Sequence, residues 1–348
     1  MSFENGLIDL RSDTVTHPTP AMRAAMAQAE VGDDVFDDDP TVHRLQERAA
    51  ALTGQAAGLF VASGTMGNLV ALLTHCGRGA DVIVGDQSHI YLNEVGGMAA
   101  LGGLAAAVVR NQPDGTLALA DIEAAIRDED VHHPRTRLIC LENTQNICGG
   151  VPLTAAYTQQ VAALALRHGL KFHLDGARLF NAAVAQGVPA AALAGPADSV
   201  MFCLSKGLSA PVGSLLCGPA DFIAEARRYR KMVGGGLRQA GVLAAAGLVA
   251  LEQMIERLED DHANARRLAE GLREVSGLEL EPGTAATNMV YVRLTGAARL
   301  SPQALTEALR TQGILIDGYA PRVRLVTHAW VTAADVDKVA AALRAALR

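Results

Sequence analysis

Between residues 57 and 217, short apolar runs alternate with segments in which apolar residues recur at helical spacing. Apolar runs of strand length, separated by helical patterns, are typical of a parallel sheet that helices cover on both faces. We therefore predict an α/β fold with a mainly parallel seven-stranded sheet sandwiched by helices. The predicted strands span residues 57–62, 81–85, 105–109, 138–142, 171–174, 199–204 and 213–217.

Helical patterns fill much of the chain between and after these strands. The predicted helices cover residues 21–29, 41–52, 67–75, 121–127, 154–168, 220–230 and 237–260. Beyond Gly277 the order changes to strand, helix, two strands and a final helix, which is a compact unit of its own. We predict a large domain over residues 1–260, which includes the N-terminal segment, and a small C-terminal α/β domain over residues 261–348.

Composition and charge narrow the class of protein. The content of 50% hydrophobic and 19% charged residues favours a globular protein with a large buried core. The formal net charge of −7 provides no positive field for nucleic acid or an anionic membrane, so we expect neither as a partner. An acidic loop at residues 32–40 has no calcium-loop spacing, and we interpret it as solvated or facing another subunit.

The cysteines and the N-terminus indicate the compartment. The five cysteines are odd in number, widely spaced and without C-x-x-C spacing, which is typical of reduced thiols and predicts no metal site. The N-terminus lacks a basic region followed by an apolar one, and no apolar run reaches about 18 residues. We therefore expect a soluble, cytoplasmic protein.

One lysine occupies a position suited to covalent chemistry. The chain has four lysines, and only Lys206 follows a predicted buried strand in a turn of small residues, Ser205-Lys206-Gly207. Open α/β sheets bind ligands at the carboxyl ends of their strands. An amine there can form a Schiff base with an aldehyde cofactor. The alternative is an ordinary surface lysine at the end of a strand.

Two further motifs fit the same cofactor. The turn 62–68, rich in small residues, joins a strand to a helix and can bind a phosphate with its backbone N–H groups, although tight turns also need glycine for steric reasons. Asp175 ends another predicted strand, where it can pair with a pyridinium nitrogen or form an ion pair with Arg178. Phosphate cup, Asp175 and Lys206 follow in the order that a pyridoxal phosphate site requires.

Further segments extend the pattern to most of the chain. Together with the motifs around Gly64, Asp175 and Lys206, these segments resemble the low-specificity L-threonine aldolases. The resemblance extends from residue 8 to residue 328. This family belongs to the aspartate-aminotransferase-like fold group, fold type I, of pyridoxal phosphate enzymes. The additional matching segments are Leu10-Arg11-Ser12-Asp13-Thr14-Val15-Thr16, Leu141-Glu142-Asn143-Thr144 and Lys231-Met232-Val233-Gly234-Gly235-Gly236-Leu237-Arg238-Gln239.

The resemblance implies roles for the residues that contact the cofactor. Gly64 and Thr65 would bind the phosphate of pyridoxal 5′-phosphate, and His89 would stack on its ring. Asp175 would pair with the ring nitrogen, and Lys206 would form the Schiff base.

The resemblance also implies contacts to the substrate. Ser12, Arg178 and Arg324 would hold the substrate carboxylate, and Arg324 agrees because it is a lone charge in the apolar pattern 323–326. Arg178 would contact the cofactor as well. Lys231 and Arg238, which flank a triple glycine, would complete the active site or its phosphate contacts, from the same or a neighbouring subunit. No metal ion is implied.

The implied activity is the reversible retro-aldol cleavage of L-threonine, L-allo-threonine and other L-β-hydroxy-α-amino acids to glycine and an aldehyde. His132 or His89 would take the proton of the substrate hydroxyl, although the residues around His132 alone indicate a surface turn. The implied assembly is a homotetramer, a dimer of dimers with active sites at subunit interfaces. A β-eliminating lyase of the same fold and a non-catalytic cofactor-binding protein are the alternatives, but the second has no need of the Lys206 amine.

Overall fold

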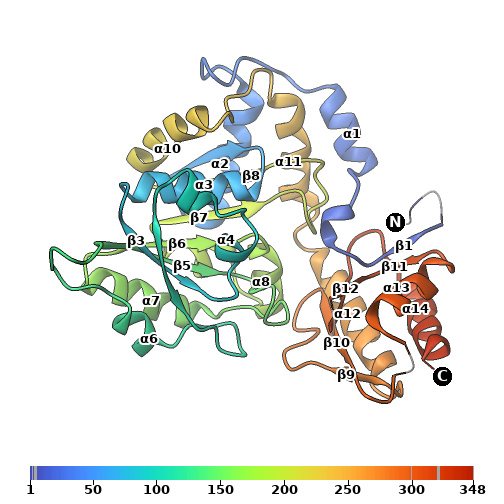
Figure 1. The fold of residues 1–348 in the computed structure, drawn as a ribbon. Helices are drawn as coiled ribbons and strands as arrows, with labels where there is room; N and C mark the ends of the chain where they lie inside the picture. Colours follow the sequence, from blue (N-terminus) through green and yellow to red (C-terminus); the bar gives the residue numbers. More distant parts are fainter. Residues whose placement is uncertain (2, 4–5, 299, 320–321, 348) are drawn as a thin grey trace.

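The computed structural model describes residues 1, 3, 6–298, 300–319 and 322–347. Its centre is a seven-stranded sheet with the strand order β2-β8-β7-β6-β5-β3-β4 (Figure 1). All neighbouring pairs are parallel except those of β8, which runs antiparallel to β2 and β7. The predicted mainly parallel sheet is confirmed. Its strands are β2 Ala57–Val61, β3 Asp81–Gly85, β4 Ala105–Val109, β5 Thr136–Glu142, β6 Lys171–Asp175, β7 Ser199–Cys203 and β8 Ser214–Gly218.

Helices cover both faces of this sheet because successive side chains of a buried strand point to opposite faces. On β7, Phe202 joins the core cluster that α2, α7, α8, α9 and α11 cover, whereas Met201 and Cys203 join the cluster under α3 and α10. The helices of the large domain are α1 Pro20–Ala27, α2 Pro40–Thr53, α3 Gly64–His75, α4 His89–Leu92, α5 Gly97–Ala100, α6 Leu119–Ala124, α7 Ala155–Arg167, α8 Leu179–Gln186, α9 Ala190–Ala194, α10 Ala220–Met232 and α11 Gly241–Gln253.

The predicted long helix over residues 237–260 is wrong. The structure has α11, then a turn, then α12 Leu258–Leu272. Helix α11 begins only at Gly241, whose N–H donates to Asp39 Oδ2 at 2.8 Å. A Cβ at residue 241 would lie 2.5 Å from Asp39 Oδ1, so the close approach requires glycine. The turn after α11 redirects the chain, and α12 then packs against the small lobe.

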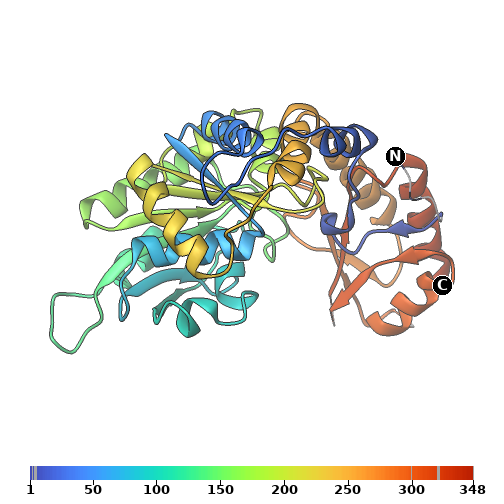
Figure 2. The same ribbon diagram turned by 90° about the horizontal axis from the view of Figure 1, so that it is seen from above.

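The small lobe is a four-stranded antiparallel sheet with three helices, seen beside the large domain in Figures 1 and 2. Its core combines apolar side chains of α12 and of the two following helices with those of the sheet. Its strands and remaining helices are β9 Leu278–Leu280, β10 Met289–Leu294, α13 Pro302–Arg310, β12 Asp317–Tyr319, β13 Arg322–Val326 and α14 Ala333–Ala346. No helix in the described part of the chain has the length and apolar character of a membrane span.

The N-terminal segment joins the small lobe. Strand β1 Ile8–Asp9 pairs in parallel with β11 Ile314–Leu315, and Ile8 and Leu10 belong to the core of the small lobe. The chain then crosses to the large domain through α1, which packs on α11. The division of the chain at residue 261 stays a prediction, but the first strand lies with the residues beyond that point.

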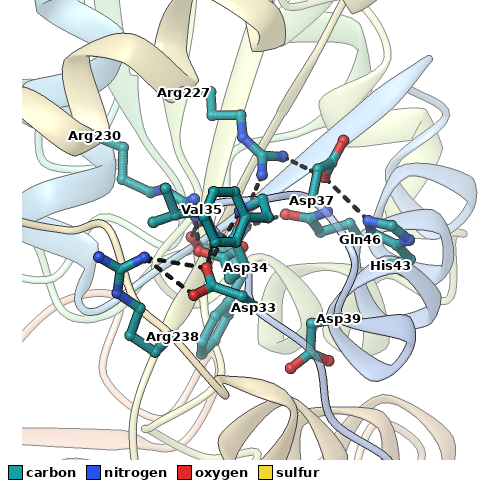
Figure 3. Close-up of polar contacts among 12 residues, drawn as sticks. Asp33, Asp34, Val35, Asp37, Asp39, His43, Gln46, Arg227, Arg230 and Arg238 are labelled. Carbon is teal, nitrogen blue, oxygen red and sulfur yellow. Dashed lines mark hydrogen bonds and ion pairs between the residues drawn. The ribbon is translucent and has the colours of Figure 1, made fainter.

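The acidic loop at residues 32–40 is an integral part of the fold (Figure 3). Asp34 and Arg230 form a buried ion pair of 2.7 Å, and Asp33 pairs with Arg238 at 3.0 Å. Asp39, also buried, caps α2 by accepting from two backbone N–H groups. The interpretation of the loop as solvated is therefore wrong for Asp34 and Asp39. The local sequence could not show this, because Arg230 lies 196 positions from Asp34.

Candidate active site

The carboxyl ends of β6 and β7 and the N-terminus of α3 meet at a cavity of about 150 Å³. Asp175 is the last residue of β6, and Lys206 follows β7 in the predicted turn. The cavity wall includes five of the predicted site residues, Gly64, Thr65, His89, Asp175 and Lys206. The structure thus brings together residues that the sequence places on four separate segments.

The N-terminus of α3 forms one end of the cavity. Ser63 caps this helix by accepting from the N–H of Met66 at 3.2 Å, so the first turn begins at Gly64. A Cβ at residue 64 would lie 2.8 Å from Cys203 Sγ, and only glycine allows the turn to approach β7 this closely. Free N–H groups and the positive end of the helix dipole suit a phosphate. The cradle therefore fits the phosphate of the expected cofactor.

Asp175 lines the same cavity, and hydrogen bonds orient both of its carboxylate oxygens. Its Oδ1 accepts from the N–H of Ala177 at 3.1 Å, and its Oδ2 accepts from Asn68 Nδ2 at 2.9 Å. The same Asn68 amide donates to Glu94 Oε1 at 2.9 Å. Burial and the nearby charge of Asp175 raise the pKa of Glu94. Neither Asn68 nor Glu94 was predicted from the sequence to be a site residue.

His89 lies between this cavity and a second one. Its Nδ1 is 3.0 Å from Glu94 Oε1, and this hydrogen bond raises the pKa of the imidazole. Its backbone N–H donates to Glu142 Oε2 at 2.7 Å, which fixes the start of α4. Burial, reinforced by the charge of Asp175, raises the pKa of Glu142 to about 7. Glu142 lies in one of the segments that carry the family resemblance, and its role here is to hold the backbone of His89.

Arg178 is already engaged within the chain. Its Nε and Nη2 donate to the two oxygens of Asp13 at 2.7 and 2.6 Å, and both side chains are buried. Burial alone would raise the pKa of Asp13, but Arg178 outweighs burial and holds that pKa well below its usual range. Asn288 of the small lobe donates to Asp13 as well, at 3.2 Å. The predicted contact of Arg178 with a substrate carboxylate stays a prediction, and any such contact would share the guanidinium with Asp13.

The second cavity, of about 450 Å³, lies between the two lobes, and its wall includes His89, Tyr291 and Arg324. Arg324 of β13 donates to Asn146 Oδ1 at 3.3 Å and to the carbonyl of Arg11 at 3.0 Å. Its Nε is buried without a hydrogen-bond partner among the described residues. The guanidinium is partly exposed and lies 3.6 Å from Asp317, and its unused donor suits a further anionic ligand; the contact with a substrate carboxylate stays a prediction. Ser12, the neighbour of Arg11, caps the short 3₁₀ helix Asp13–Val15.

Four predicted site residues are absent from the walls of both cavities: Ser12 and Arg178, described above, and His132 and Arg238. His132 is 84% exposed and pairs with Asp130 at 2.7 Å, on the loop between α6 and β5. Figure 2 shows this loop extending away from the body of the large domain. Arg238 is 58% exposed and pairs with Asp33, as Figure 3 shows. Within one chain, the structure therefore does not bring His132 or Arg238 to the other site residues.

The fold and the cavity define a lysine-bearing α/β enzyme of fold type I, and comparisons with known proteins agree. Residues 9–295 match the Beta-eliminating lyase family. A low-specificity L-threonine aldolase of Arabidopsis thaliana is 50% identical over 333 residues, which cover 94% of this chain and 93% of that protein. The low specificity L-threonine aldolase of Escherichia coli K12 is 46% identical over 98% of this chain and 99% of its own length.

A solved structure shares the fold. A threonine aldolase of Leishmania major superposes with a TM-score of 0.82 over 98% of this chain and 100% of that one, at 21% identity. The chain belongs to the Beta-eliminating lyase family and, within it, to the low-specificity L-threonine aldolases.

Proposed function

We propose that the protein cleaves L-threonine, L-allo-threonine and related L-β-hydroxy-α-amino acids to glycine and an aldehyde, with pyridoxal 5′-phosphate as cofactor. The observation that carries the proposal is the meeting of Lys206, Asp175 and the N-terminus of α3 in one cavity. An amine, a buried carboxylate and a phosphate cradle are the three contacts that this cofactor needs. We infer the reaction from relatives at 46–50% identity, which are named low-specificity L-threonine aldolases.

Each end of the cavity has a distinct task. Bound pyridoxal phosphate supplies an electron sink when a bond to the substrate α-carbon breaks. The N–H groups at Gly64 and Thr65 would bind the phosphate, and the Lys206 amine would provide the covalent attachment. Asp175 would accept a hydrogen bond from the ring nitrogen and so favour its protonated form. Arg324 orients the substrate carboxylate from the small lobe.

His89 is the base that the chain itself offers to the substrate hydroxyl. Glu94 accepts from Nδ1, so in the neutral ring Nδ1 carries the proton and Nε2 is free to accept one. Removal of the hydroxyl proton allows the bond between the α- and β-carbons to break and the aldehyde to leave. The prediction that His132 performs this step would require the loop of another subunit, because His132 is remote from its own cavity.

Product analysis tests the reaction. Purified protein with pyridoxal phosphate is incubated with L-threonine and, separately, with L-allo-threonine, and the products are identified by mass. We expect glycine and acetaldehyde from both. Formation of 2-oxobutyrate and ammonia would instead establish a β-eliminating lyase, the activity that names the family. The ratio of the two rates gives the preference for one substrate stereoisomer.

We infer that the protein forms a homo-oligomer, a dimer of dimers, in the cytoplasm. The cytoplasmic assignment is supported by the five cysteines, none of which forms a disulfide.

Exposed apolar side chains such as Phe36 (77%) and Val95 (97%) support association, since such side chains are common at interfaces. Sedimentation should show a tetramer at assay concentrations. An active, monodisperse monomer would contradict the proposed assembly.

A further inference from the structure

Four side chains that sequence analysis did not assign form a continuous path of hydrogen bonds beneath α3. His75 Nε2 lies 2.7 Å from Ser199 Oγ, which lies 2.8 Å from His173 Nδ1. His173 Nε2 lies 3.1 Å from Asn68 Oδ1. The path ends at the cavity, where Asn68 Nδ2 lies 2.9 Å from Asp175 Oδ2. We call His75, Ser199, His173 and Asn68 the relay.

The fold places these residues in line. Asn68 and His75 are seven positions apart on α3, so they share one face of the helix, two turns apart. His173 and Ser199 are direct partners on the parallel strands β6 and β7. Asp175 is two residues beyond His173 and faces the same side of the sheet. The relay is therefore the polar contact between one helix face and one patch of sheet.

The chemistry of the carboxylates dictates the direction of every hydrogen bond in the relay. An ionised carboxylate only accepts, so the Asn68 amide group must be the donor to Asp175, and Asn68 Oδ1 must face His173. His173 then carries its proton on Nε2 and accepts at Nδ1 from the Ser199 hydroxyl. Ser199 in turn accepts from His75 Nε2. All four groups donate toward Asp175, and hydrogen bonds aligned in this way polarise and strengthen one another.

Burying these polar side chains costs free energy of folding, and packing alone would not require them. Ser199 and His173 are 0% exposed and Asn68 is 1% exposed. Burial lowers the pKa of His173 to about 3 and that of His75 to about 4, so the relay is uncharged at neutral pH. Apolar side chains could fill this space without any need for partners. The relay instead delivers a hydrogen bond to the carboxylate at the end of the cavity.

Asn68 has a second task, because its one amide group bridges two carboxylates. Asp175 Oδ2 and Glu94 Oε1 both accept from Asn68 Nδ2 at 2.9 Å. Without this shared donor, the two buried carboxylates would repel each other across the cavity. The oxygen of the same amide group is held by His173, so both ends of the Asn68 side chain are fixed.

We propose that the relay positions the Asp175 carboxylate toward the ring nitrogen of pyridoxal phosphate and thereby sets the affinity for this cofactor and the rate of the chemical step. The inference deepens the proposed function and rests on it. The relay residues other than Asn68 do not line the cavity, so they act as positioning residues.

The test compares variants at three distances from the cavity. Asn68→Leu keeps the side-chain size but removes the donor, and we expect the dissociation constant for pyridoxal phosphate to rise about 10- to 100-fold, the range for loss of a hydrogen bond to a charged group. We expect kcat to fall similarly, with KM for L-threonine nearly unchanged. Ser199→Ala removes a hydroxyl whose partners, His75 and His173, lie outside the cavity wall, and it should produce a smaller change in the same direction, about 2- to 10-fold. His173→Gln, which keeps an N–H donor, should retain more affinity than His173→Leu.

Thr158→Ala is the matched control for Ser199→Ala. Thr158 is also 0% exposed, and its hydroxyl donates to the backbone carbonyls of Thr154 and Ala155 at the start of α7. Both variants should lose thermal stability, but only Ser199→Ala should change the dissociation constant. If Asn68→Leu, His173→Leu and Ser199→Ala lower Tm while cofactor affinity and kcat stay within twofold of the unmodified protein, the relay is merely structural and the proposal is overturned. If the unmodified protein itself fails to bind pyridoxal phosphate, the cofactor assignment fails together with the relay.

Discussion

Lys206→Ala is expected to abolish turnover and the visible absorption that bound pyridoxal phosphate gives the protein. Lys206 is the one described lysine in the cavity wall, and alanine has no amine with which to bind the cofactor covalently. We expect kcat for L-threonine cleavage to fall by at least about four orders of magnitude, the scale for removal of a nucleophile. Absorption spectra and single-turnover assays measure both effects.

The control for this variant is Lys338→Ala. Lys338 is 69% exposed on α14, where its contact with Asp335 is solvated, and its removal should leave both the spectrum and kcat unchanged. Melting curves should show that Lys206→Ala remains folded, since the Lys206 side chain has no ion pair among the described residues. Retained activity with an intact visible band would mean that another lysine binds the cofactor.

Asp175→Asn is expected to lower kcat by a factor of about a hundred or more while leaving the fold intact. Asparagine has nearly the shape of aspartate, and its amide oxygen can still accept from Asn68 or from the N–H of Ala177. What would be lost is the negative charge that we propose keeps the ring nitrogen protonated. The effect should therefore fall on kcat, with a small change in KM.

Two further measurements separate charge from folding in this variant. Tm should not fall, because the substitution removes a buried negative charge near Glu94. In the unmodified protein, the charge of Asp175 is one cause of the raised pKa of Glu94. The pKa of Glu94 should decrease toward its ordinary value, which titration by NMR can follow. A kcat within a few-fold of the unmodified protein would mean that a group other than Asp175 holds the ring nitrogen.

The sheet could be predicted because buried parallel strands consist of nearly continuous apolar residues. Each of the seven predicted strands overlaps an observed one. The helices α8 and α9 were missed, since Gly187 and Pro189 interrupt an alanine-rich stretch that has no clear period. The end of α11 was missed as well, because no strong helix-breaking residue marks the turn at residues 254–257.

The site could be predicted only as far as single residues show their chemistry. Lys206 and Asp175 stand out because a charged residue at the end of an apolar strand is unusual. The partners of these residues do not stand out, since the pair of Asp13 and Arg178 joins positions 165 apart. His173 and Ser199 are polar side chains within buried strands, and this pattern indicates buried polar contacts. A sequence alone does not show what such residues contact.

The interlocking of the chain ends has a consequence for biosynthesis. His328 donates to the carbonyl of Asp9 across 319 positions, and Asn288 completes the surroundings of Asp13. Strand β1 cannot pair with β11 until residues 314–315 have left the ribosome, so Ile8 and Leu10 stay uncovered until then. Completion of the cavity between the lobes must accordingly follow synthesis of the small lobe, and a prematurely terminated product would lack Arg324 even with the large sheet and Lys206 in place.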